Sequence, residues 1–142
     1  MIQEIIQKWD KNKPKLEEYF KNTPQSEYDT YKKIVIKLLE LVINDEEDDY
    51  IFDIKKMTII DDGDYQGTQI FIIPKKTYQP SIEEYIVTHT YYGSCSSCDT
   101  LQGISNYSDE LPNEEQLKEY MTLALHIVQK IHWLEEHDYN KN

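Results

Sequence analysis

The spacing of apolar residues predicts helices at both ends of the chain and strands between them. Over Met1–Trp9, apolar residues recur at the three- and four-residue spacing of one helix face. Pro14 is expected to interrupt this helix, because proline in a helix interior lacks the amide donor and clashes with the preceding turn. A stronger helix is predicted to begin with Thr23 as N-cap and Pro24 as its first residue, and to end at about Ile43.

The middle of the chain is rich in β-branched and aromatic residues and is broken by turn residues. Strands are predicted at Tyr50–Ile54, Met57–Ile60, Thr68–Pro74 and Glu84–Tyr92. Asp61–Gly67 contains two glycines and several side-chain acceptors, which is typical of a turn. Because the connections are short, we expect neighbouring strands to run antiparallel as a meander.

The last third of the chain returns to helical spacing. A short helix is predicted near Cys98–Ile104, and Asn113 with Gln116 forms a capping-box pattern before a long apolar stripe that reaches Leu134. The fold class predicted is α+β: a small antiparallel meander of three to four strands packed with N-terminal and C-terminal helices. Residues 1–142 are expected to form one domain, helical over 1–43 and 93–142, with the β-sheet over 50–92.

The charge of the chain limits the partners that it can have. Its 142 residues carry a net charge of −12, and every basic residue is a lysine. The acidity, together with the lack of arginine, argues against direct binding to nucleic acid. No apolar run reaches the length of a membrane span, and the N-terminus lacks the pattern of a signal peptide. We therefore expect a cytoplasmic protein without membrane contact, whose two cysteines are reduced or metal-bound.

The acidic residues concentrate between Asp45 and Asp64, where nine carboxylates face only two lysines. One interpretation is a solvated, mobile surface, the usual meaning of a charge run. The other is a nucleic-acid-mimicking surface that occupies a basic groove in a partner protein. The candidate partner-binding residues are Asp45, Glu46, Glu47, Asp48, Asp49, Asp53, Asp61, Asp62 and Asp64.

Cys95 and Cys98 form the single C-x-x-C of the chain, and three interpretations stay open. They could supply two zinc ligands, with histidines completing the shell. They could form a redox site before a helix, although the meander around them is not of the thioredoxin type. They could also pack as small apolar residues in a tight corner, which composition alone favours. The histidines considered as further ligands are His89, His126 and His132.

A tryptophan on the last predicted helix is a further candidate for partner contact. Trp133 follows His126 and Lys130 on the side opposite the apolar stripe, where it either anchors a partner or covers an edge of the first helix. His137 continues the same row. No complete catalytic motif is present, so we do not expect an enzyme.

Two segments resemble small acidic proteins of bacteriophages and prophages. These are "GDYQGTQIFII" and "EEYIVTHTYYGSCSSCDTLQGI", which carry a D-Y-Q-G-T segment followed by Y-G-S-C-x-x-C-D-T-L. The resemblance covers roughly Asp64–Ile104. Many small acidic phage proteins inhibit host defence, and by size, charge and composition the chain is similar to anti-CRISPR proteins that act on Cas9.

The resemblance and the charge together lead to one functional hypothesis and two alternatives. The hypothesis is a phage-type inhibitor that binds a Cas9-type effector stoichiometrically through its acidic surface. The first alternative is a zinc- or thiol-dependent small protein that uses Cys95 and Cys98. The second is a module that sequesters a small nucleotide signal by stacking a base on Tyr85, Tyr91 or Tyr92.

Overall fold

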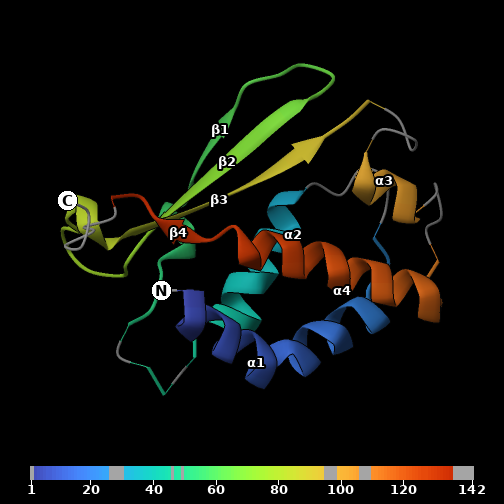
Figure 1. The fold of residues 1–142 in the computed structure, drawn as a ribbon, viewed down its shortest axis with the longest axis horizontal. Coiled ribbons are helices and arrows are strands. Elements are labelled where there is room, and N and C mark those ends of the chain that lie inside the picture. Colours follow the sequence, from blue (N-terminus) through green and yellow to red (C-terminus); the bar gives the residue numbers. More distant parts are fainter. Residues whose placement is uncertain are drawn as a thin grey trace.

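A computed structural model describes residues 2–25, 31–45, 47–48, 50–94, 99–105 and 110–135. The fold is α+β, as the sequence predicts, with helices at both ends of the chain and an antiparallel sheet between them (Figure 1). The helical elements are α1 (Ile2–Asn22), α2 (Tyr31–Leu38), the π-helix η1 (Leu39–Ile43), the 3₁₀ turns η2 (Ile54–Lys56) and η3 (Ile82–Glu84), α3 (Thr100–Ser105) and α4 (Glu114–Gln129). The strands are β1 (Thr58–Asp61), β2 (Gly67–Pro74), β3 (Tyr85–Tyr92) and β4 (His132–Trp133).

The four strands lie in the order β1-β2-β3-β4, and every neighbouring pair is antiparallel. Phe71 lies opposite Ile59 on one side and Thr88 on the other. Because side chains alternate between the two faces of a sheet, this register places Phe71, Ile73 and Ile86 on the inner face. All three are fully buried there, and in Figure 1 the helices lie on one side of the sheet, with the β1–β2 turn projecting beyond them.

The helical layer forms around α1, which packs against α4 and η1. The rings of Phe20 in α1 and Tyr120 in α4 stack at 5.3 Å between centroids. Leu16 and Phe20 of α1 and Ala124 of α4 are completely buried. Burial of large apolar side chains is worth about 1.5–3 kcal/mol each, so this layer supplies much of the stability of the fold.

Pro14 does not interrupt the first helix, contrary to the prediction from its sequence. The helix α1 continues through it as a single element of 21 residues. Pro14 is exposed, while Ile5 and Trp9 before it and Leu16 and Phe20 after it are all buried. Packing of both halves on the same core therefore outweighs the hydrogen bond that proline cannot make to the carbonyl of Asp10.

The second helix also differs from its prediction at its start. Pro24 and Gln25 lie outside any helix, residues 26–30 are not among the described residues, and α2 begins at Tyr31. Its predicted end is confirmed, because η1 continues α2 to Ile43. Two α1 side chains satisfy carbonyls that this helix end leaves without partners: Asn12 Nδ2 donates to Val42 O at 3.0 Å, and Lys8 Nζ donates to Ile43 O at 2.9 Å.

The last helix begins at the predicted capping box of Asn113 and Gln116, but it ends earlier than its apolar stripe suggests. The Thr88 hydroxyl of β3 donates to the carbonyl of Ile127 at 2.8 Å, and helical structure stops at Gln129. The chain then adds β4 to the sheet, with Trp133 paired to Ile86. Trp133 is therefore a strand residue, and its predicted place on an exposed helix face is wrong.

The predicted strand Tyr50–Ile54 is reduced to one bridge, between Phe52 and Lys75. The Asn44 side chain holds this segment by bonding both the amide and the carbonyl of Phe52 at 2.9 Å. Asp53 then caps η2 by accepting from the amide of Lys55, and β1 begins at Thr58 after this turn.

Replacing Pro14 with alanine is expected to stabilise the protein. The substitution restores an amide donor inside α1, where proline costs about 3 kcal/mol relative to alanine, and the more flexible unfolded chain offsets part of the gain. We expect the free energy of unfolding in urea to rise by about 1–2 kcal/mol, whereas Lys15→Ala on the same exposed surface should change it by less than about 0.5 kcal/mol. A lower stability of Pro14→Ala would show that the helix needs the proline.

Candidate functional site

The acidic residues that the sequence brings together divide into two groups at opposite ends of β2. Asp61, Asp62 and Asp64 lie at the turn before Gly67, whereas the amide of Asp53 donates to the carbonyl of Pro74. A strand rises about 3.3 Å per residue, so the eight residues of β2 separate the two groups by roughly 23 Å. In Figure 1 the β1–β2 turn lies far from the helical layer. No single surface collects all the described carboxylates.

The first group is largely neutralised by lysines of α1. Lys11 Nζ bonds Asp45 at 2.8 Å and Glu47 at 3.3 Å, and Lys8 Nζ pairs with Asp48 at 2.5 Å. The hydrogen bond from Lys11 lowers the pKa of Asp45 to about 2, because it favours the charged carboxylate. Glu46 and Asp49 lie outside the described residues.

The second group forms an ordered turn at the end of the β1–β2 hairpin. Asp61 accepts hydrogen bonds from the Tyr92 hydroxyl at 2.5 Å, from the amide of Gly63 and from the Gln69 side chain. Asp62 accepts from the amide of Thr68 at 2.7 Å. A Cβ added at Gly63 would lie 1.9 Å from the carbonyl oxygen of Gln66, so this turn requires glycine there. Among the described residues, no lysine pairs with these carboxylates.

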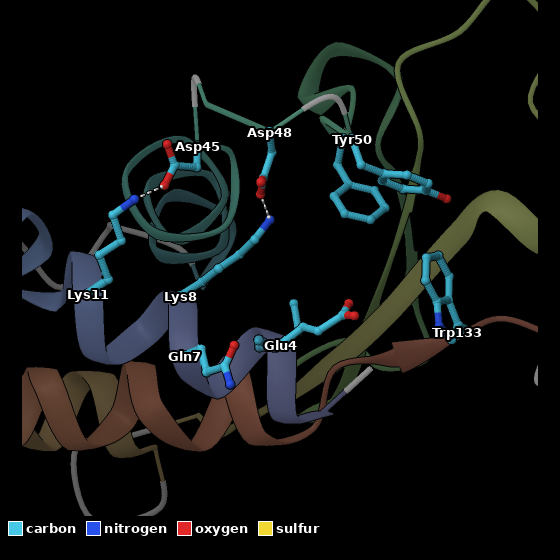
Figure 2. A pocket seen from close by; sticks show the side chains of 10 residues that line it. Glu4, Gln7, Lys8, Lys11, Asp45, Asp48, Tyr50 and Trp133 are labelled. Atoms are coloured by element: carbon cyan, nitrogen blue, oxygen red, sulfur yellow. Dashed lines mark hydrogen bonds and ion pairs between the residues drawn. The ribbon is translucent and has the colours of Figure 1, made fainter.

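A hollow of about 630 Å³ lies between α1, the segment after η1, and β4. We call it the aromatic pocket; Figure 2 shows its side chains. Trp133 is half-buried in its wall, with its ring 5.9 Å from that of Tyr50 and 6.2 Å from that of Phe52. Its lining residues are Glu4, Ile5, Gln7, Lys8, Lys11, Asp45, Asp48, Tyr50, Phe52 and Trp133. The structure therefore brings Trp133 together with two of the predicted acidic residues.

Cys95 and Cys98 lie outside the described residues, but the chain on either side of them is held by a buried hydrogen-bond network. Asp99 is 5% exposed and accepts from the Tyr31 hydroxyl at 2.9 Å, from the amide of Gly93 at 2.8 Å and from the amide of Gln102 at 3.1 Å. It thus joins α2, the end of β3 and the start of α3. Burial raises the pKa of Tyr31, and the nearby Asp99 carboxylate raises it further, so the hydroxyl stays a donor.

The histidines considered as zinc ligands lie in two separate places, with His89 and His132 on the same face of neighbouring strands and His126 elsewhere. His89 and His132 are exposed on β3 and β4, and His126 lines a separate hollow between α3 and α4. Burial lowers the pKa of His89, and the charges of Lys130 and His132 lower it further. Within the described ranges, which leave out both cysteines and His137, no three His, Cys, Asp or Glu side chains gather around a common point. Zinc binding at Cys95 and Cys98 stays a prediction.

The tyrosines proposed for base stacking lie on both faces of β3. Tyr85 and Tyr91 alternate to the outer face of β3, where Tyr91 is exposed, while Tyr92 bonds Asp61.

Along the described chain, no helix is both long and apolar enough to cross a membrane.

Sequence analysis missed several residues that organise these sites. The N-cap role of Asp99 had a local signal, because aspartate often precedes a helix, but its partner Tyr31 is 68 residues away. Glu4, Lys8, Tyr50 and Phe52 had no such signal, because the aromatic pocket depends on contacts between segments distant in sequence.

Removing the Tyr31 hydroxyl tests the buried hydrogen-bond network around Asp99. Tyr31→Phe deprives the buried Asp99 of a donor and the amide of Leu101 of its acceptor. We expect the free energy of unfolding to fall by about 1–3 kcal/mol. Tyr78→Phe removes a hydroxyl from an exposed ring and should leave it unchanged. Equal stability of the two variants would contradict the network.

Replacing Tyr92 tests the order of the hairpin turn. The Tyr92 hydroxyl lowers the pKa of Asp61 by donating to its charged form, and the same bond raises the pKa of Tyr92 to about 12. In Tyr92→Phe the carboxylate loses this donor, so its pKa should rise toward the ordinary value of about 3.9. An NMR titration that follows the carboxyl carbon of Asp61 measures this pKa. Tyr91 is next to Tyr92 but is not bonded to Asp61, so Tyr91→Phe should leave the pKa of Asp61 unchanged.

Comparison of this chain with protein-family models, with curated proteins and with solved structures finds no match in any of the three. The similarity to phage proteins therefore stays a prediction from the two sequence segments that carry it.

Proposed function

We propose that this protein is a phage-type inhibitor that binds a Cas9-type effector stoichiometrically and occupies its basic nucleic-acid groove. The observation that carries the proposal is the ordered acidic turn formed by Asp61–Asp64, which we call the hairpin tip. Two of its carboxylates, those of Asp61 and Asp62, accept hydrogen bonds from the amides of Gly63 and Thr68, and no described lysine pairs with any of the three. A net charge of −12 favours fast association with a basic partner.

The hairpin tip supports this function better than the acidic group near α1. Asp45 and Asp48 already pair with Lys11 and Lys8, so these lysines compensate much of their negative charge. At the hairpin tip the turn is ordered before any partner arrives, so binding costs less conformational entropy. Carboxylates at fixed positions can replace phosphates in a groove that evolved for nucleic acid.

An exposed aromatic residue at the same turn supports the proposal. Tyr65 follows Asp64 directly and is 83% exposed. Tyrosine is enriched among the residues that dominate binding energy at protein interfaces, because it buries a large rigid ring. In a nucleic-acid groove the Tyr65 ring would stack where a base normally lies. Charge would then steer the approach of the protein, and Tyr65 would slow its dissociation.

Neutralising the hairpin tip is expected to weaken inhibition. The double variant Asp62→Asn and Asp64→Asn removes two charges, while the asparagine at position 62 keeps an oxygen that can accept from Thr68. We expect its dissociation constant for a guide-loaded Cas9-type effector to rise about tenfold, mainly through slower association, with a matching loss of inhibition in a DNA-cleavage assay.

The matched control changes the same net charge on the exposed surface of α1. Asp10→Asn with Glu17→Gln also removes two carboxylates, and should alter binding by less than about threefold. If the hairpin-tip variant inhibits as strongly as the unmodified protein, or the control loses as much, the hairpin tip is not the contact surface.

A further inference from the structure

The aromatic pocket lies away from the hairpin tip and has chemistry of its own. Its floor is α1, which contributes residues on one helix face, including Glu4, Ile5 and Lys8. Tyr50 and Phe52 approach from the segment clamped by Asn44, and Trp133 enters from β4. The volume of about 630 Å³ is in the range of pockets that hold small ligands or single side chains.

One charge in this pocket has no partner among the residues that the structure describes. Lys8 pairs with Asp48 and also donates to the Ile43 carbonyl, and Lys11 pairs with Asp45. Glu4 makes no hydrogen bond or ion pair with any described residue. Figure 2 shows its side chain reaching from α1 toward Trp133, whereas Lys8 points away toward Asp48. The open part of the pocket is thus bounded by an indole ring and by a carboxylate that no described residue pairs with.

Like the Glu4 carboxylate, the aromatic rings of the pocket favour a positively charged ligand. The face of an indole ring attracts positive charge more strongly than that of a phenol or phenyl ring. The neighbouring Tyr50 already binds a cation in this way, because Lys75 Nζ lies 4.3 Å from the centre of its ring. Lys75 does not line the pocket, so it leaves the pocket open to a second cation.

Other classes of ligand fit this pocket less well. An anion would meet lysines that are already paired, beside three carboxylates from Glu4, Asp45 and Asp48. A neutral apolar ligand would take the Glu4 carboxylate out of water without a partner, which costs free energy. A divalent metal needs several oxygen ligands around one point, and the described residues offer no such group.

We propose that the aromatic pocket binds an organic cation, an alkylammonium or guanidinium group, between the Glu4 carboxylate and the ring of Trp133. Glu4 pairs with the positive charge, and the indole covers the apolar part of the group. The proposal does not rest on inhibition of an effector, since none of the three hairpin-tip aspartates lines this pocket.

The two tryptophans of the chain make a direct test possible. Trp133 lines the aromatic pocket, while Trp9 is 5% exposed and lines a different hollow, between α1 and α4. In ¹H–¹⁵N spectra of the full chain each indole N–H gives its own signal, so Trp9 is the internal reference. We expect the Trp133 signal to move saturably with an added cation, while the Trp9 signal stays in place.

The ligands added distinguish the source of the cation. N-acetylarginine amide represents a side chain of a partner protein, spermidine represents a free polyamine, and N-acetylcitrulline amide is a neutral analogue of the first. Tighter binding of the arginine compound points to a partner side chain, and tighter binding of spermidine points to a free cation. Equal binding of the citrulline compound, or no saturable shift with either cation, would overturn the proposal.

Two variants of equal charge change complete the test. Glu4→Gln should weaken cation binding about tenfold, because a bond between charged groups becomes one to a neutral amide. Glu17 lies on the same helix but at the hollow that Trp9 lines, so Glu17→Gln should leave the affinity for the cation unchanged. Unchanged binding by Glu4→Gln would also overturn the proposal, and neither result bears on the effector-inhibition assay.

Discussion

The end of the second helix is held by two side chains of the first, and much of the molecule depends on that contact. Asn12 and Lys8 donate to the carbonyls of Val42 and Ile43, which would otherwise be left without partners at the end of η1. With this end fixed, Asn44 can clamp Phe52, and the bridge from Phe52 to Lys75 ties the segment to the end of β2. Helical layer, sheet and aromatic pocket are therefore joined through one helix terminus.

The same contact determines where negative charge remains available. Lys8 reaches the end of η1 and pairs with Asp48 from there, and Lys11, one turn further along α1, pairs with Asp45. The carboxylates near α1 thus belong to the internal structure of the protein. Asp61 and Asp62 at the hairpin tip accept instead from neutral donors, the Tyr92 hydroxyl and the amide of Thr68, and no lysine in the described part of the chain pairs with them. This division supports assigning partner contact to the hairpin tip.

Sequence patterns predicted the fold class and most elements, because the long helices and the β-rich middle carry clear periodicity. The failures occurred where tertiary contacts outweigh local preference. Pro14 stays inside α1 because both of its flanks are buried, and α4 ends where Thr88 bonds Ile127, a contact 39 residues apart. Because the sequence did not show that α4 ends at Gln129, it could not predict that Trp133 lies in β4. The sequence showed that carboxylates are concentrated between Asp45 and Asp64, but not that they form two separate groups. Their separation depends on the length and position of β2, which composition does not give.

The central claim is that the hairpin tip, rather than the carboxylates beside α1, contacts the partner. Hydrogen–deuterium exchange of the protein, free and bound to a guide-loaded Cas9-type effector, tests it most directly, since it reports amide protection segment by segment. The account predicts slower exchange on binding for the amides of residues 61–68, with no change over 44–53. Protection of 44–53 with an unchanged hairpin tip would contradict it.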